Sequence, residues 1–180
     1  MKEIVYRAKH GDEKAFSQLV KRYSRWSLGL ASAFVGIDKA EDIAQEMWIT
    51  VWKNLKSLKD ANALKSWMRT TLIRIALKSG KNPFSDVLYL DEEISTCHHS
   101  LQESELEILE ELVLKEKLEQ VYSTLNDQER VLITLYGLEQ MSMKEIAVEL
   151  NLQIGTVKSK IHYMKQKIKS LDSKKEDAYG

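Results

Sequence analysis

Hydrophobic and polar positions follow a helical period along most of the chain. Between residues 38 and 55, apolar side chains recur every four positions at Ile43, Met47, Val51 and Leu55. This spacing places them on one face of an α-helix. The strict alternation of a half-buried strand is nearly absent, and only seven glycines and one proline interrupt the pattern. We therefore predict an all-α fold.

Turn and capping residues divide the chain into two small helical domains. Asp38 and Glu41, three apart, predict a capping box that starts the helix over residues 38–55. Pro83, in the turn-rich stretch "SGKNPFSD", marks the end of the first domain near Asn82. Helical spacing returns after Glu105. We predict domains over residues 1–82 and 105–180, joined by a linker over residues 83–104.

The C-terminal region has the punctuation of a helix-turn-helix. Two capping-box pairs start consecutive helices, namely Asn126 with Glu129 and Ser142 with Glu145. Gly137 is expected to end the first of these helices in the left-handed conformation. Asn151 tolerates a positive φ and is expected to turn the chain tightly, with Leu152 filling the corner.

The stretch "GTVKSKIHYMKQKIK" continues this region as a helix from about Ile154. We expect two parallel stripes on it, one apolar and one basic. The apolar stripe comprises Val157, Ile161, Met164 and Ile168, and the basic stripe comprises Lys158, His162, Lys165 and Lys169. Such a basic face is suited to the major groove of DNA. The alternative is a solvated lysine face with no ligand.

Charge is distributed unevenly along a chain of 180 residues whose net charge is zero. Residues 1–90 hold 16 Lys and Arg against 9 acids, residues 91–130 hold 3 against 12, and residues 131–180 hold 8 against 6. The local balances of +7, −9 and +2 describe a basic front, an acidic middle and a C-terminal piece with concentrated lysines. The joining segment is thus predicted to be acidic.

Other sequence features exclude several classes of protein. One cysteine, Cys97, rules out an internal disulfide framework, and charges in residues 1–11 argue against a secretory signal. Every apolar run is too short to cross a bilayer, so we expect a cytoplasmic protein. The sequence shows no recognisable nucleophilic triad, glycine-rich phosphate loop or carboxylate-metal cluster. We therefore expect no enzymatic activity, no cofactor and no small-molecule substrate.

Three further groups of residues leave alternatives open. Trp48 and Trp52 either pack in the core or face a partner. The basic side chains of the helix after residue 64, with no acid among them, either aid solubility or contact nucleic acid. "CHH", residues 97–99, lacks the usual spacing of zinc ligands, so we expect an exposed thiol beside two histidines and no metal.

Three stretches resemble one protein family over nearly the whole chain. They are "GDEKAFSQLVKRY", "AEDIAQEMWITVWKNL" followed by Trp67, and "LNDQERVLITLYGLEQMSMKEIAVELNLQIGTVKSKIH". In order and spacing they are similar to an extracytoplasmic-function sigma factor, the smallest class of the bacterial sigma family. The resemblance implies a specificity subunit that lends promoter recognition and melting to RNA polymerase and carries out no chemistry itself.

The resemblance also implies roles for individual residues. Docking on the beta-prime clamp helices of core RNA polymerase would involve Asp42, Gln45, Glu46, Trp48 and Lys53. The promoter's minus-ten element would be melted and bound, with a flipped base in a loop pocket, by Lys59, Asp60, Asn62, Lys65, Trp67, Arg69, Thr70, Arg74 and Lys78. The minus-thirty-five element would be bound by Thr156, Lys158, Ser159, Lys160, His162, Tyr163 and Lys165.

The resemblance further implies contacts with promoter DNA, the beta flap of the polymerase and an anti-sigma factor, with the acidic linker threading toward the RNA exit path. The chain departs from the family pattern at Arg74 and Lys78 in the promoter-melting helix, and at Lys160, where arginine is common. Lysine offers a point charge where arginine offers a bidentate fork.

Two rival interpretations are a stand-alone helix-turn-helix regulator that binds operator DNA as a dimer, and a helical adaptor that sequesters another protein.

Overall fold

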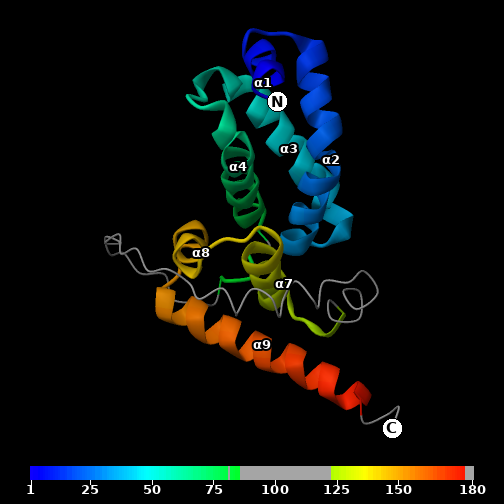
Figure 1. The fold of residues 1–180 in the computed structure, drawn as a ribbon, viewed down its shortest axis with the longest axis vertical. Coiled ribbons are helices and arrows are strands. Elements are labelled where there is room, and N and C mark those ends of the chain that lie inside the picture. The colour runs from blue at the N-terminus through cyan, green and yellow to red at the C-terminus, as the bar shows by residue number, and fades with distance from the viewer. Residues whose placement is uncertain (81, 86–122, 177–180) are drawn as a thin grey trace. The chain divides into compact units, whose positions relative to one another are not determined.

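All regular structure in the described part of the chain is helical (Figure 1). The computed structural model describes residues 1–80, 82–85 and 123–176, with side chains described as far as residue 170. The chain divides into two compact units, Met1–Pro83 and Phe84–Gly180. The prediction of an all-α fold with two helical domains is confirmed. Most of the predicted acidic linker lies outside the described residues.

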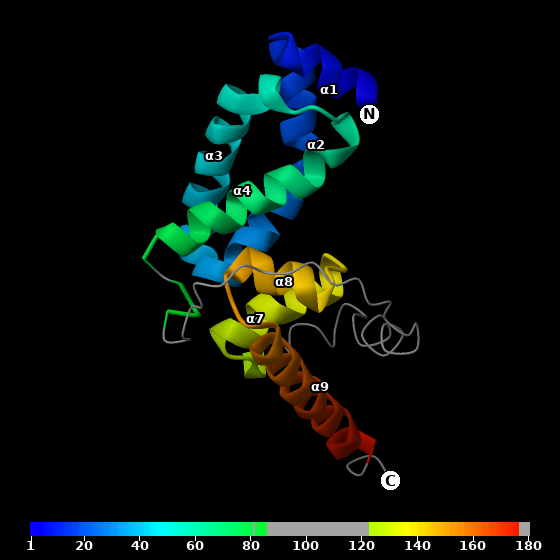
Figure 2. The same ribbon diagram turned by 90° about the vertical axis from the view of Figure 1, so that its left-hand side faces the viewer.

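The front unit is built on an antiparallel pair of long helices. Figure 2 shows the fourth helix crossing this pair, and it packs against both members. The helices are α1 (Lys2–Lys9), α2 (Glu13–Val35), α3 (Ile37–Asn54) and α4 (Leu64–Lys78), with 3-10 turns η1 (Leu55–Ser57) and η2 (Ala61–Ala63) between α3 and α4. Fully buried apolar side chains from all three long helices form the core, among them Leu19, Met47, Val51, Met68 and Leu72.

The start of α3 differs from the prediction. Gly36 alone connects α2 to α3, with φ 81° and ψ 167°, a conformation that favours glycine. α3 therefore begins at Ile37, and Asp38 lies inside its first turn with no side-chain capping hydrogen bond. The predicted Asp38–Glu41 capping box is wrong because the one-residue connection leaves no room for a capping residue at position 38. Asp38 still lies favourably near the positive end of the helix dipole.

The C-terminal unit contains a helix-turn-helix whose helix starts match the prediction. Its described elements are α7 (Asp127–Ile133), the π-helical turn η3 (Thr134–Leu138), α8 (Met143–Leu150) and α9 (Ile154–Glu176). Both predicted capping boxes are confirmed. The reciprocal bonds measure 2.9 and 2.9 Å for Asn126 with Glu129, and 2.8 and 3.3 Å for Ser142 with Glu145.

Gly137 does not end the first of these helices as predicted. It lies within η3, where the Glu139 N–H donates to the Thr134 carbonyl at 2.9 Å, a bond that spans five residues. The wider turn carries the helix past Gly137. The left-handed residue is Gln140, with φ 52°.

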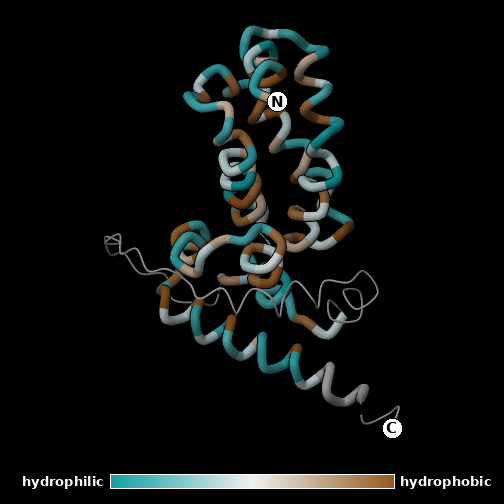
Figure 3. The backbone as a smooth tube through the Cα atoms, viewed as in Figure 1, coloured by the Kyte–Doolittle hydropathy of each residue, from teal (hydrophilic) through white to brown (hydrophobic). Residues whose placement is uncertain are grey.

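The turn between α8 and α9 is as predicted. Asn151 has φ 52° and ψ 50°, and the Leu152 N–H donates to the Ala147 carbonyl at 2.8 Å. The side chain of Leu152 is buried in the corner. The predicted apolar stripe of α9 is also buried, and apolar and polar positions alternate along this helix in Figure 3. Among the described residues, no helix has the length and apolar character needed to cross a membrane.

The left-handed conformation at Asn151 yields a testable prediction. Asn151→Ala is expected to lower the free energy of unfolding of the C-terminal unit by about 1 kcal/mol, because a Cβ without a polar side chain tolerates this conformation poorly. Asn151→Gly should leave stability unchanged or raise it. Amide hydrogen exchange of α8 in the full chain measures both effects. Equal protection in the two variants would contradict the assignment.

Candidate nucleic-acid and protein interfaces

The first half of α9 exposes most of the residues predicted to contact the minus-thirty-five element. Lys158, Ser159 and His162 are exposed, and Tyr163 is 68% exposed. Thr156 is half-buried beside them. The Ser159 hydroxyl bonds to carbonyls of its own helix at 3.1 Å. This surface therefore offers one ammonium, one imidazole and one phenol to a ligand.

Two of the predicted DNA-contacting lysines are instead held within the unit. The Lys160 ammonium donates to Gln128 Oε1 of α7 at 2.5 Å. The Lys165 ammonium lies 5.0 Å from the centroid of the Tyr136 ring and 3.4 Å from its hydroxyl oxygen. Both side chains are half-buried. Lys165 of the predicted basic stripe is therefore only partly exposed, because this position borders the packed side of α9.

A third lysine of α9 ties this helix to α7. Lys167 Nζ lies 2.7 Å from Glu129 Oε2, the same carboxylate that completes the capping box of α7. The basic helix therefore uses part of its charge to hold its own domain together. Lys158 and Lys169 remain exposed.

The outer face of α3 carries the residues predicted to dock on polymerase. Asp42, Gln45, Glu46 and Lys53 are all exposed. Trp48 is half-buried and meets the Phe16 ring of α2 edge-on at 5.9 Å. These exposed polar side chains, with Trp48 at their border, form one continuous helix face.

Trp52, the second tryptophan of α3, is both packed and exposed, so it agrees in part with each of the two predicted alternatives, core packing and a partner-facing position. The Trp52 ring lies 4.6 Å from that of Phe16, yet its side chain is 39% exposed. It therefore packs on α2 with one part and presents another part to solvent.

Ile49 is a candidate interface residue that the sequence interpretation missed. It is 54% exposed, and its position on α3 falls between those of Asp42, Glu46 and Lys53. The sequence did contain a signal for its exposure, because Ile49 lies outside the apolar stripe of the same helix. An exposed apolar centre with a charged rim is typical of a protein-docking site. We call this surface (Asp42, Gln45, Glu46, Ile49, Lys53) the docking face.

The residues of α4 predicted to contact the minus-ten element divide between two sides of the helix. Trp67, Thr70, Arg74 and Lys78 are spaced three or four positions apart and form what we call the α4 outer face. Lys65 and Arg69 lie on the flank toward α2. The Lys65 ammonium lies 5.4 Å from the centroid of a Trp26 ring, and Arg69 Nε is buried.

The loop before α4 is a structured turn. Asp60 Oδ1 accepts a hydrogen bond from the Asn62 N–H at 2.9 Å and so caps η2. Lys59 and Asn62 have exposed side chains. The Lys9 ammonium of α1 donates to the Leu58 carbonyl at the entry to this turn.

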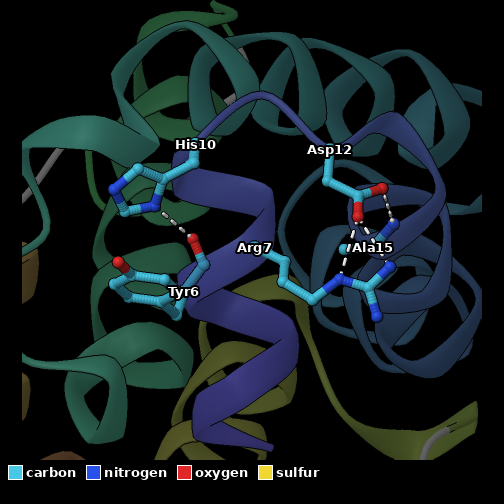
Figure 4. Close-up of polar contacts among 5 residues, drawn as sticks. All are labelled: Tyr6, Arg7, His10, Asp12 and Ala15. Carbon is cyan, nitrogen blue, oxygen red and sulfur yellow. Dashed lines mark hydrogen bonds and ion pairs between the residues drawn. The ribbon is translucent and has the colours of Figure 1, made fainter.

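α1 is itself fastened to the start of α2, as Figure 4 shows. Arg7 donates to Asp12 Oδ2 from Nε at 2.9 Å and from Nη2 at 2.6 Å. Asp12 Oδ1 accepts from the Ala15 N–H at 3.0 Å and caps α2. The Ala15 N–H, and then the Arg7 guanidinium, hold the pKa of Asp12 below its ordinary value. α1 therefore braces the loop against α2, a role that the sequence interpretation missed.

No group of three His, Cys, Asp or Glu side chains that could hold a metal occurs among the described residues. Cys97, His98 and His99 lie outside them, so the expectation for this segment stays a prediction.

Comparison with known proteins places the chain in a family. Residues 19–79 match the family model "Sigma-70 region 2", and residues 115–168 match "Sigma-70, region 4". The RNA polymerase sigma-H factor of Pseudomonas aeruginosa is 31% identical over 180 residues, which cover 92% of this chain and 90% of that relative. The ECF RNA polymerase sigma-E factor of Escherichia coli K12 is 32% identical over 178 residues, with the same coverage.

A solved structure shares the fold. The structure of CnrH in complex with the cytosolic domain of CnrY matches with a TM-score of 0.55 and covers 96% of each chain. Its sequence identity is 19%, so this likeness concerns the fold alone.

The contacts of Asp12 predict a pH-dependent stability. Because its folded-state pKa is lowered, the ionised carboxylate stabilises the front unit at neutral pH, and this stabilisation is lost as pH falls below the ordinary aspartate value of about 3.9. Asp12→Asn should therefore lower Tm at pH 7 and differ much less from the unsubstituted chain at pH 3. Tryptophan fluorescence measures this unit, since all four tryptophans lie in it.

Asp42→Asn is the matched control, because Asp42 is exposed and forms no ion pair with a described residue. Its Tm should follow that of the unsubstituted chain at both pH values. An Asp12→Asn deficit that persists undiminished at pH 3 would contradict the role given to the carboxylate.

Proposed function

Because the chain belongs to the extracytoplasmic-function sigma factors, which bind core RNA polymerase and promoter DNA and direct transcription initiation, we propose that its two units divide this work between them. The predicted domain over residues 1–82, which belongs to the front unit, docks on the polymerase and opens the minus-ten element. The predicted domain over residues 105–180, which belongs to the C-terminal unit, binds the minus-thirty-five element. The acidic segment between them threads toward the RNA exit path.

The docking face is the surface we assign to the beta-prime clamp helices. Its three exposed acid and amide side chains, Asp42, Gln45 and Glu46, lie one to two turns before Ile49 on the same face of one helix. An apolar anchor with polar neighbours supports a protein contact, since hot spots are small desolvated centres inside a polar rim. Trp48 and Lys53 border this centre and complete the contact.

The α4 outer face and the loop before it are the surface we assign to the minus-ten element. The loop residues Lys59 and Asn62 have exposed side chains on a turn that Asp60 caps. A fixed turn suits the capture of a flipped base, because its groups need no further ordering. Arg74 and Lys78 supply positive charge along the helix that follows, where phosphates would lie.

The start of α9 is the surface we assign to the minus-thirty-five element. Lys158, Ser159, His162 and Tyr163 lie on its exposed side, directly after the Asn151 turn. In a helix-turn-helix the first residues of the second helix contact base edges in the major groove. Lys160 and Lys165 remain in the proposed contact set, but reaching DNA would require them to leave Gln128 and Tyr136. The beta flap of the polymerase is the proposed protein contact of this unit.

The protein supplies specificity and no chemistry of its own in this proposal, and it acts in the cytoplasm beside the polymerase. An anti-sigma factor is a further proposed partner. The structural neighbour CnrH is in complex with the cytosolic domain of CnrY, and the shared fold supports an analogous regulator here.

The observation that carries the proposal is the presence, in one chain, of an exposed acid-and-amide face and a separate helix-turn-helix. In vitro transcription from a promoter library, with core polymerase plus and minus this protein, tests it. We expect sequence-directed transcripts only when both are present. Tight operator binding by the protein alone would instead identify the stand-alone regulator. The helical adaptor predicts no sequence-directed transcripts, and a binding of its protein partner that Lys158→Glu with Lys160→Glu leaves intact.

Charge reversal on the docking face should weaken polymerase binding. Asp42→Lys with Glu46→Lys is expected to weaken the complex with core enzyme at least tenfold, about 1.4 kcal/mol, because like charges would replace complementary ones. Ile49→Ala should weaken it through lost apolar burial. Glu3→Lys, an exposed reversal on α1, is the control. Co-elution and titration with core enzyme measure the effects, and equal binding by all variants would refute the docking face.

Lysines of α9 should separate into DNA-contacting and domain-stabilising residues. Lys158→Ala is expected to reduce transcription from promoters with a minus-thirty-five element and to lower the log-log salt slope by about 0.9. Lys167→Ala should instead destabilise the C-terminal unit by about 0.5 kcal/mol, because it removes a half-exposed ion pair with Glu129. Salt-dependent promoter binding and α9 hydrogen exchange measure the two. Identical profiles for both variants would contradict this division.

A further inference from the structure

α2 carries a run of cations that none of the proposed contacts uses. Between Glu13 and Asp38 the chain has no acidic residue, whereas it has Lys14, Lys21, Arg22 and Arg25. All four side chains are exposed, and within the described part of the chain they form no ion pair. Their charge is therefore not neutralised by the described parts of the fold.

Several other cations of the described chain have partners within the fold. Arg7 is paired with Asp12, and Lys167 is paired with Glu129. Three cations in five residues of one helix, with no described acid to balance them, repel one another and carry an electrostatic cost in the free protein. An anionic ligand would remove that cost.

The position of these cations follows from the two sides on which α2 packs. Phe16 faces α3, where its ring meets those of Trp48 and Trp52. Trp26 faces α4, where the Lys65 ammonium lies 5.4 Å from its ring centroid. At about 100° per residue, Arg22 lies about 40° from Trp26 around the helix, on the side away from Phe16.

Arg25 follows about 60° further around the helix and Lys21 about 100° beyond Arg22, so these cations form a surface that runs from the α4 edge of α2 onto its outer side. We call it the α2 cationic patch (Lys21, Arg22, Arg25 and Lys65). Lys65 is in the first turn of α4, directly after the loop that carries Lys59 and Asn62. The patch is thus continuous with the surface assigned to the minus-ten element. The docking face, in contrast, belongs to α3.

The chemistry of the patch suits a phosphodiester backbone. An arginine guanidinium presents a planar fork of donors that matches phosphate oxygens in a bidentate manner. Arg22 and Arg25 are three positions apart on a 23-residue helix, so their spacing is fixed. The patch includes no apolar anchor as exposed as Ile49, which argues against a protein partner.

We propose that the α2 cationic patch binds the phosphate backbone of promoter DNA beside the minus-ten site, as a second set of DNA contacts in the front unit. This inference rests on the proposed function, because it uses the minus-ten surface to place the DNA. It concerns affinity and salt dependence and assigns no base specificity, since phosphate contacts position a protein on DNA without carrying sequence information.

The test compares two double variants that remove the same charge. Arg22→Gln with Arg25→Gln removes two cations from the patch, whereas Lys2→Gln with Lys39→Gln removes two exposed cations from α1 and α3. Each variant is assembled with core polymerase, and binding to a promoter fragment is measured as a function of salt. The patch variant should lower the log-log slope by about 1.8 if the contacts are with duplex, or about 1.4 if they are with a single strand. The control should leave it unchanged.

Two DNA probes identify the source of the phosphates. One carries only the duplex upstream of the minus-ten element, and the other carries only the single-stranded non-template segment. The patch variant should lose affinity for one of them selectively. Arg22→Lys with Arg25→Lys retains both charges and should recover most of the slope while losing the bidentate geometry.

Several outcomes would overturn the inference. One is a patch variant whose slope equals that of the control. Another is a patch variant that no longer co-elutes with core polymerase while its circular dichroism melting is normal, since the patch would then be a protein contact. Both outcomes are distinct from failure of the proposed function, in which the unsubstituted chain itself would not co-elute with core enzyme.

Discussion

The packing of α2 between α3 and α4 determines which side chains the front unit presents. Phe16 and Trp26 each commit one side of α2 to a neighbour, through rings at 4.6 and 5.9 Å on α3 and an ammonium at 5.4 Å on α4. Each neighbour then has only its own outer side left for a partner. On α3 that side carries acids and an exposed isoleucine, and on α4 it carries a tryptophan and two cations. An acidic and a basic surface are thus kept on different helices, as the proposed binding of a protein by α3 and of a nucleic acid by α4 requires.

Local patterns were enough to predict the fold, and several details of it, from the sequence. The capping boxes at Asn126 and Ser142 and the left-handed turn at Asn151 depend on residues within three or four positions of each other, so the residue types alone specify them. The same holds for the buried stripe of α9. Asp38 shows the limit of this approach, because its residue type suits a cap but the connection at Gly36 decides where the helix begins.

Contacts between distant segments could not be predicted in the same way. Lys160 and Lys165 are lysines on a helix whose sequence is typical of DNA binding. Their side chains nevertheless contact Gln128 and Tyr136, about thirty residues earlier in the chain. The bond from Lys9 to the Leu58 carbonyl likewise joins segments 49 residues apart. Periodicity indicates which side of a helix is buried, but it does not indicate which neighbour lies at the border of that side. At such border positions a long lysine side chain can either contact a neighbouring helix of its own domain or bind a ligand.

These border contacts bear on how strongly the proposed surfaces bind DNA. With Lys160, Lys165 and Lys167 turned toward α7 and η3, Lys158 is the exposed lysine in the first two turns of α9. A surface with few free cations gains little from counterion release, so its affinity for a duplex should be low. Two weak DNA surfaces on one chain gain strength when both engage the same promoter, because the second contact forms at a high effective concentration. Docking on the polymerase would supply a third point of attachment and fix the spacing between the other two. A neutral chain that binds DNA weakly alone and firmly within the polymerase is the expected consequence.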